Sequence, residues 1–232
     1  MKTALLAACL VMGLGHSARA ETCRQALALG LDVSGSVDAR EYRLQMDGLA
    51  QALGSTAVRA ALLEQIDAPV ELLIYEWSGP QDLMTLVPWT RITSPSTLDA
   101  VIAQLLGVTR REGSTPGTAL GVAMLRGAQH LSERSHCWQR TLDISGDGKS
   151  NLGPRPRNLK AQIEAQGVTI NALVIDADNT QDLGGGLAAY FRADVILGPN
   201  AFVETANGFE DYAAAMEIKL LRELDGLVLS MK

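Results

Sequence analysis

Apolar segments of strand length alternate with segments of helical periodicity along most of the chain. Several of the apolar segments are almost uninterrupted, as in strands buried on both faces of a sheet. The alternation predicts a single doubly wound α/β domain, with a mostly parallel central sheet and helices on both faces. Strands are predicted over residues 25–33, 70–77, 82–87, 139–145, 168–175 and 201–205, and helices over 38–53, 56–66, 96–106, 116–131, 157–166 and 209–224.

Local signals refine two of these elements. The segment 82–87 follows a strand after the turn sequence Ser78-Gly79-Pro80, which predicts a short antiparallel edge strand. Thr115 precedes Pro116, and proline is favoured at the first position of a helix. Thr115 is therefore predicted to cap the helix 116–131.

The first twenty residues have the order of a cleavable secretory signal. Lys2 is followed by an apolar stretch from Ala4 to Leu14 and by small residues ending in Ala18-Arg19-Ala20. Cleavage near Ala20 is predicted, which gives a signal peptide at 1–20, one domain at 21–232, and a periplasmic or secreted location.

A second interpretation of this segment is a lipoprotein signal. Leu6-Ala7-Ala8-Cys9 spells a lipoprotein-type box, in which Cys9 would be acylated. It is disfavoured because most of the apolar segment would then follow the cleavage site.

The charge balance is acidic. The formal net charge is −6, and losing Lys2 and Arg19 with the signal would take it to −8. This balance argues against nucleic acid and anionic membranes as partners. No later stretch approaches the roughly 18 apolar residues of a membrane helix, so no membrane span is predicted.

Three segments place oxygen side chains where strands end or a helix begins. They are Asp32-Val33-Ser34-Gly35-Ser36, Gly113-Ser114-Thr115-Pro116-Gly117-Thr118 and Ser145-Gly146-Asp147-Gly148. Each alone is an ordinary turn or cap sequence. Together they indicate a metal site, because ligands of open α/β sheets bind beyond the carboxyl ends of the strands and hard divalent cations prefer oxygen ligands.

These segments resemble, position by position, the metal-ion-dependent adhesion site of von Willebrand factor A domains, which also occurs in integrin I domains. The chain is most similar to a bacterial family of secreted proteins with this fold and no assigned function. The resemblance implies that Ser34 and Ser36 bind Mg²⁺ directly, that Thr115 binds it directly or through water, and that Asp32 and Asp147 bind mostly through water. Mn²⁺ is an alternative ion.

The second segment departs from the family pattern. Many members have Thr-x-Thr-Gly here, whereas Thr115-Pro116-Gly117-Thr118 is one residue short before Ala119-Leu120. Thr115 is the preferred ligand because it is predicted to cap the helix. Thr118 is interpreted as structural.

The leading functional hypothesis is a binding module, not an enzyme. Through its bound Mg²⁺ it would coordinate an Asp or Glu carboxylate of a protein partner. One alternative is a metal-dependent phosphoester hydrolase, which would need Asp143 or Glu76 as its base. Another is a structural domain with a non-functional metal site. The role of Asp143 stays open between facing the site and pairing with Arg140 or another polar group, since a buried unpaired carboxylate is costly.

The fold resemblance also bears on the two remaining cysteines. It implies that the strands after Cys23 and Cys137 are parallel neighbours, which would bring both cysteines to the end of the sheet opposite the metal. A Cys23–Cys137 disulfide is therefore predicted for an exported chain. The alternative is two separate buried thiols.

Overall fold

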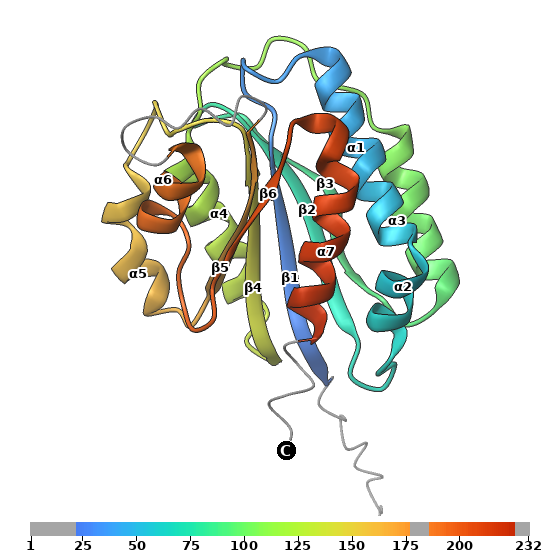
Figure 1. Cartoon of the computed structure of the whole chain (residues 1–232). Coiled ribbons are helices and arrows are strands. Elements are labelled where there is room, and N and C mark those ends of the chain that lie inside the picture. Colours follow the sequence, from blue (N-terminus) through green and yellow to red (C-terminus); the bar gives the residue numbers. More distant parts are fainter. Residues whose placement is uncertain (1–21, 177–185, 226–232) are drawn as a thin grey trace, which may run out of the picture.

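Six strands form one sheet in the computed structural model, which describes residues 22–176 and 186–225. The sheet order is β3-β2-β1-β4-β5-β6 (Figure 1), and every neighbouring pair is parallel except β2 with β3. The strands are β1 Cys23–Asp32, β2 Val70–Trp77, β3 Leu83–Arg91, β4 Cys137–Gly146, β5 Thr169–Ile175 and β6 Val203–Ala206. The predicted mostly parallel sheet with one antiparallel edge strand is confirmed.

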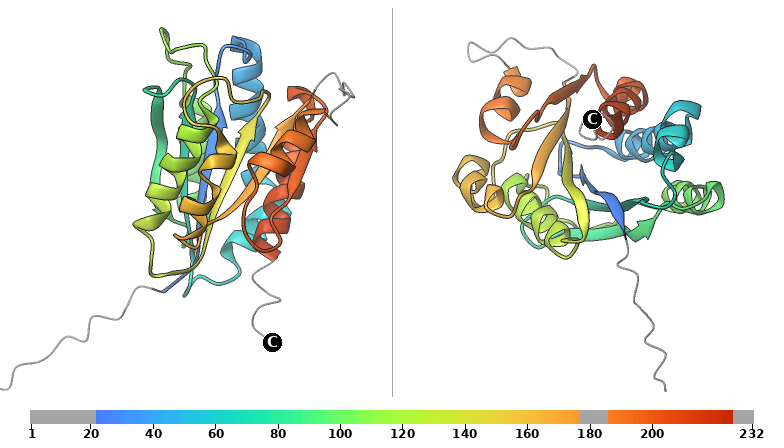
Figure 2. Two further views of the ribbon diagram at one scale, coloured as in Figure 1. Left: turned by 90° about the vertical axis from the view of Figure 1, so that its left-hand side faces the viewer. Right: turned by 90° about the horizontal axis from the view of Figure 1, so that it is seen from below.

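Helices cover both faces of the sheet (Figure 2). One face carries α1 Ala39–Gly54, α2 Thr56–Leu63, α3 Pro95–Gly107 and α7 Tyr212–Asp225, with the short helix η2 Phe209–Asp211 before α7. The other carries α4 Leu120–Ser132, η1 Pro156–Asn158, α5 Lys160–Glu164 and α6 Gly186–Asp194. The predicted doubly wound α/β fold is thus confirmed. The predicted signal peptide lies outside the described residues.

Strand β1 lies in the middle of the sheet and is buried along its whole length. Leu27, Leu29 and Leu31 pack into the hydrophobic cluster beneath α1 and α7, while the small Ala26 and Ala28 face the cluster beneath α4. The period-2 alternation of a strand therefore supplies both cores from one segment. Because both faces are filled, only the two ends of β1 remain for polar chemistry.

The start of α4 differs from the prediction. This helix begins at Leu120, with Ala119 as its cap residue and no side-chain cap, so Thr115 does not cap it. The segment before it bonds to neighbouring loops instead: Gly35 N–H donates to the carbonyl of Pro116 at 2.9 Å, and Ala119 N–H donates to that of Ser78 at 2.8 Å. These tertiary hydrogen bonds satisfy backbone groups that a first helical turn would otherwise use.

Two further differences concern the second half of the chain. The predicted helix 157–166 is divided into η1 and the five-residue α5, and α6 was not predicted at all.

Within the described ranges, no helix is both long enough and apolar enough to cross a membrane.

The predicted disulfide between Cys23 and Cys137 is confirmed. The two residues are direct partners in the β1–β4 pairing, with their Cα atoms 4.4 Å apart. They lie at the amino ends of these strands, which is the end opposite the three polar segments. The bond thereby fixes the register of β1 against β4 at one end of the sheet.

We expect the disulfide to contribute strongly to stability because it closes a long loop, with a sequence separation of 114 between its cysteines. Replacing both cysteines with alanine should lower the free energy of unfolding by up to about 4 to 5 kcal/mol, the chain-entropy value for a loop of this size. Urea denaturation of both proteins measures the difference. A loss below about 1 kcal/mol would contradict the expectation.

Candidate metal centre

The three polar segments meet at the carboxyl edge of the sheet, at the top of Figure 1. Asp32 is the last residue of β1, and Ser34 and Ser36 lie in the loop that leads to α1. Asp147 follows β4, the parallel neighbour of β1. The parallel pairing of these two central strands is what brings their loops together.

Hydrogen bonds join four of the five predicted ligand residues. Ser36 Oγ donates to Asp147 Oδ1 at 2.8 Å, and the hydroxyl oxygens of Ser34 and Ser36 are 3.3 Å apart. The backbone N–H of Ser34 donates to Asp32 Oδ1 at 2.8 Å. The structure therefore brings Asp32, Ser34, Ser36 and Asp147 together, as a shared ion would require.

The threonine that joins this group is Thr118. Its Oγ1 donates to Ser34 Oγ at 3.3 Å, its side chain is buried, and its N–H is held by Asn151 Oδ1 at 2.8 Å. Thr115 instead directs its backbone N–H to Asp82 Oδ2 at 2.9 Å. The preference for Thr115 depended on a helix cap that is not formed, and Pro116 placed the expected helix start four residues too early.

The Asp32–Ser36 loop is held rigidly from three sides. Gln45 Nε2 donates to the backbone carbonyl of Asp32 at 3.0 Å. The Arg110 guanidinium donates to the carbonyls of Val33, Ser34 and Val37. Pro116 contacts Gly35 so closely that a Cβ there would lie 2.6 Å from Pro116 Cβ, which explains the glycine. The hydroxyls of this loop are thus positioned in advance for a ligand.

The electrostatics of the site favour a bound cation. Burial raises the pKa of Asp32 to about 7, the negative charge of Asp147 adds to this rise, and hydrogen bonds from Ser34 oppose it. Burial also raises the pKa of Asp147, against the hydrogen bond from Ser36. Asp32 Oδ2 is buried and has no hydrogen-bond partner among the described residues. A cation would stabilise both carboxylates.

The donor set fits a hard divalent ion. Two carboxylates and three hydroxyls offer oxygen atoms only, which suits Mg²⁺ or Mn²⁺ better than softer ions that favour thiolate or imidazole. The members are Asp32, Ser34, Ser36, Thr118 and Asp147. The residues present therefore fit the ion that the sequence pattern predicts.

The two carboxylates considered as catalytic bases are both engaged elsewhere. Glu76 Oε2 accepts a hydrogen bond from the hydroxyl of Tyr42 at 3.0 Å. Asp143 Oδ2 lies 2.6 Å from Lys219 Nζ, so its partner is this lysine and not Arg140. Glu76 thus has a hydroxyl partner and Asp143 has an ionic partner.

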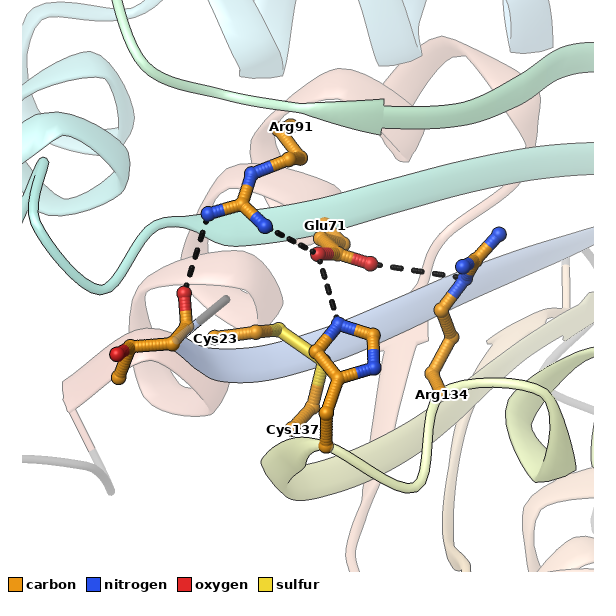
Figure 3. Close-up of a disulfide and its surroundings, with 7 residues drawn as sticks. Cys23, Glu71, Arg91, Arg134 and Cys137 are labelled. Atoms are coloured by element: carbon orange, nitrogen blue, oxygen red, sulfur yellow. Dashed lines mark hydrogen bonds and ion pairs between the residues drawn. A yellow bond between two sulfur atoms is a disulfide. The ribbon is translucent and has the colours of Figure 1, made fainter. Parts of the chain in front are cut away.

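A second group of metal-ligand types surrounds the disulfide (Figure 3). Ligand atoms of Cys23, Cys137, Glu71 and His136 lie within 4.8 Å of one another. The sulfurs are bonded to each other and cannot serve as thiolate ligands. Glu71 already pairs with His136 at 3.1 Å, and Figure 3 also shows its ion pairs with Arg91 and Arg134. This cluster is an ion-pair network around the buried carboxylate of Glu71, not a metal site.

Solved structures share this fold. The chain is similar to proximal thread matrix protein 1 from the mussel byssus, with 18% identity, a TM-score of 0.63, and coverage of 88% of this chain and 48% of that one. It is similar to the pilus adhesin SpaC from Lactobacillus rhamnosus GG, with 14% identity, a TM-score of 0.60, and coverage of 90% and 31%. It is also similar to a von Willebrand factor type A structure from Catenulispora acidiphila. The identity is 13%, the TM-score is 0.58, and the match covers 87% of this chain and 43% of that one.

The sheet order and these likenesses define the class: the domain is a von Willebrand factor A-like domain. The chain belongs to the family described as "Protein of unknown function (DUF1194)", whose match covers residues 22–228. It spans about half the length of the mussel protein's chain. Among curated proteins, no relative is found.

The raised pKa of Asp32 predicts a pH-dependent loss of stability without metal. In the folded chain this carboxyl holds its proton up to about pH 7, whereas in the unfolded chain it releases the proton near pH 4. The folded state therefore binds more protons across this window, and the free energy of unfolding falls as pH rises through it. Asp32→Asn removes this ionisation.

In chelator, wild type should therefore lose stability between pH 4 and pH 8, whereas Asp32→Asn should not lose this contribution. The free energy of unfolding of the variant minus that of wild type should increase over this range. The increase should reach a few kcal/mol, since one pKa unit corresponds to about 1.4 kcal/mol. Urea denaturation at the two pH values measures it. Parallel pH profiles for the two proteins would show that Asp32 is not the titrating group.

Proposed function

We propose that this domain is a metal-dependent protein-binding module. Its ion would be held by Asp32, Ser34, Ser36, Thr118 and Asp147, so Thr118 replaces Thr115 in the ligand set. The observation that carries the proposal is the buried Oδ2 of Asp32, which has no hydrogen-bond partner in the part of the chain that the structure describes, near three hydroxyls that lie together. A structure of the mussel matrix protein with a zinc-occupied metal-ion-dependent adhesion site supports a divalent ion in this fold.

The ligand types determine what the ion would do. Ser34 and Ser36 would bind it through neutral hydroxyls, Thr118 directly or through water, and the carboxylates of Asp32 and Asp147 mostly through water. Neutral direct ligands leave most of the positive charge of Mg²⁺ or Mn²⁺ uncompensated, and Mg²⁺ retains exchangeable waters. Such an ion can accept an outside carboxylate as a further ligand.

The partner would accordingly be a protein that presents an Asp or Glu side chain. The chain itself carries a formal charge of −6, so an acidic partner is repelled at long range. The bound ion would have to supply the local attraction, and binding should therefore depend on the metal.

The names of two structural neighbours support this kind of role. They are described as a thread matrix protein and a pilus adhesin. The engagement of Glu76 with Tyr42 and of Asp143 with Lys219 supports a binding role over hydrolysis. We further propose that residues 1–20 are a signal peptide and that the mature domain is periplasmic or secreted, which is consistent with the disulfide.

The metal site is tested with a pair of matched threonine variants. Thr118→Val should weaken Mn²⁺ or Mg²⁺ binding at least tenfold, because it removes a hydroxyl from the cluster, and Ser34→Ala should do the same. Thr115→Val should bind the metal as wild type does, because the Thr115 contacts lie at Asp82. Isothermal titration calorimetry measures the affinities. Equal affinities for wild type and Thr118→Val, or a loss confined to Thr115→Val, would refute this ligand set.

The binding role is tested by capture from a periplasmic extract. Immobilised wild-type domain should retain a partner in Mg²⁺ and release it in chelator, while Thr118→Val should retain none and Thr115→Val should behave as wild type. Converting acidic residues of the captured partner to amides should abolish retention. A partner that stays bound in chelator, or that tolerates loss of every surface carboxylate, would contradict coordination through the ion.

A further inference from the structure

Lys219, on the helix α7, is buried between two carboxylates. It is 0% exposed, and its Nζ lies 2.6 Å from Asp143 Oδ2 and 2.7 Å from Glu223 Oε1. Asp143 and Glu223 are buried as well. Asp143 belongs to β4, so the group spans the interface between the centre of the sheet and α7.

The group is costly as a set of separate ions. Two carboxylates and one ammonium carry a net negative charge in a region that excludes water, and desolvation of buried ions costs several kcal/mol each. The ring of Phe202 adds an apolar wall, with its centroid 5.5 Å from Lys219 Nζ. A reaction that removes two of the three charges would relieve this cost.

The contact of Lys219 with Asp143 is close without being an ordinary hydrogen bond. Nζ lies 2.6 Å from Oδ2, yet neither oxygen of Asp143 has a hydrogen-bond partner of acceptable geometry. Because a carboxyl C–O bond is about 1.2 Å long, Nζ lies within about 4 Å of the Asp143 Cγ. Reacting atoms in near-attack geometries lie about 3 to 3.5 Å apart, so at most a small shift of Nζ would bring it to the Asp143 Cγ.

We propose that Lys219 and Asp143 form an intramolecular amide bond, with Glu223 as the proton relay. A proton passes from the ammonium to Asp143, and the free amine of Lys219 attacks the Asp143 Cγ. Glu223 takes a proton from the attacking nitrogen and delivers it to the departing hydroxyl. The N–C bond forms, the C–O bond breaks, and one water leaves; no oxidation or reduction occurs.

The surroundings of Glu223 suit the relay. Its Oε1 accepts from both Lys219 Nζ and Asn171 Nδ2, each at 2.7 Å, which fixes the carboxylate beside the amine. Its Oε2 is buried and has no hydrogen-bond partner in the described part of the chain, so it is available to carry a proton. General acid–base groups need this hydrogen-bond reach to the proton that they move.

The protonation states are compatible with the step. Burial lowers the pKa of Lys219, but the two carboxylates together raise it by more, so the ammonium is its resting form. Burial raises the pKa of Asp143 in spite of the lysine beside it, which makes the uncharged acid accessible as the electrophile. The reactive pair forms when one proton moves from Lys219 to Asp143.

Tryptic peptide mapping of the reduced and alkylated wild-type chain tests the bond. The sequence places Asp143 in the fragment 141–149, Lys219 in 193–222 and Glu223 in the fragment that follows Arg222. We expect 141–149 joined to 193–222, with a mass lower than the sum of the two by that of one water, about 18 Da. Tandem mass spectrometry should place the link at Asp143 and Lys219.

Other outcomes would overturn the proposal. Trypsin cleaves after an unmodified Lys219, so finding only the unjoined fragments 141–149 and 193–219 would do so. A link from 193–222 to the fragment containing Glu223 would do so as well. A link from 193–222 to the fragment 161–192, with a loss of about 17 Da for ammonia, would indicate reaction at Asn171 instead. Because the measurement uses the wild-type chain, its result does not depend on whether any variant folds.

The relay is tested with Glu223→Gln and a matched control. Glu223→Gln should retain a fold, shown by circular dichroism and by the intact disulfide, but should lack the joined fragments. Lys219→Arg keeps the positive charge and cannot form the amide, so it gives the unlinked pattern for comparison. Full cross-linking in a folded Glu223→Gln protein would exclude Glu223 as the relay. These results do not depend on metal binding at the carboxyl edge.

Discussion

The burial of the Asp32 carboxylate is the constraint on which the candidate site depends. Asp32 ends a strand that is packed on both faces, and one of its oxygens has no partner in the described residues. An unsatisfied buried carboxylate costs free energy unless it is neutralised or paired. Hydroxyls from two loops lie beside it, and in the proposed function a bound cation would complete this group.

Two other buried carboxylates of this fold have cationic partners. Glu71 is paired with Arg91, Arg134 and His136, and Asp143 is paired with Lys219. For Asp32 and Asp147 the described residues supply hydroxyl and N–H donors but no cationic side chain. Within residues 22–176 and 186–225, the contacts given above for these two acids thus include no ion pair.

The sequence predicted the fold class and the disulfide because both follow from patterns that tertiary contacts reinforce. Apolar runs such as that of β1 can be buried only between two helical layers. Once β1 and β4 are parallel neighbours, Cys23 and Cys137 become direct partners in the register. Four ligand candidates also came from segments that immediately follow these strands, where the chain has little freedom in position. The start of α4 and its Thr115 cap were predicted wrongly because a local signal, Pro116, competed with tertiary hydrogen bonds. These bonds delay the helix to Leu120, and Thr118 bonds to Ser34. No local pattern reports such pairings, because the partners lie between 41 and 84 positions away in the chain.

The same reasoning explains why the buried lysine could not be assigned from sequence. Asp143 lies in an apolar strand and demands a partner, yet the partner is on the last helix of the described chain. The β1–β4 pair thus carries a disulfide at its amino end, Asp143 beside Lys219 beneath α7, and a polar cluster at its carboxyl end.

The proposed metal centre would have few direct ligands, and these would have to be held within a fraction of an ångström. The disulfide sets the register of β1 against β4, and the pairing from Gln25 to Leu31 transmits that register to the opposite end. Asp32 and Asp147 are therefore placed relative to each other by the rigid centre of the sheet, and only the hydroxyl loops need further positioning by Arg110 and Pro116.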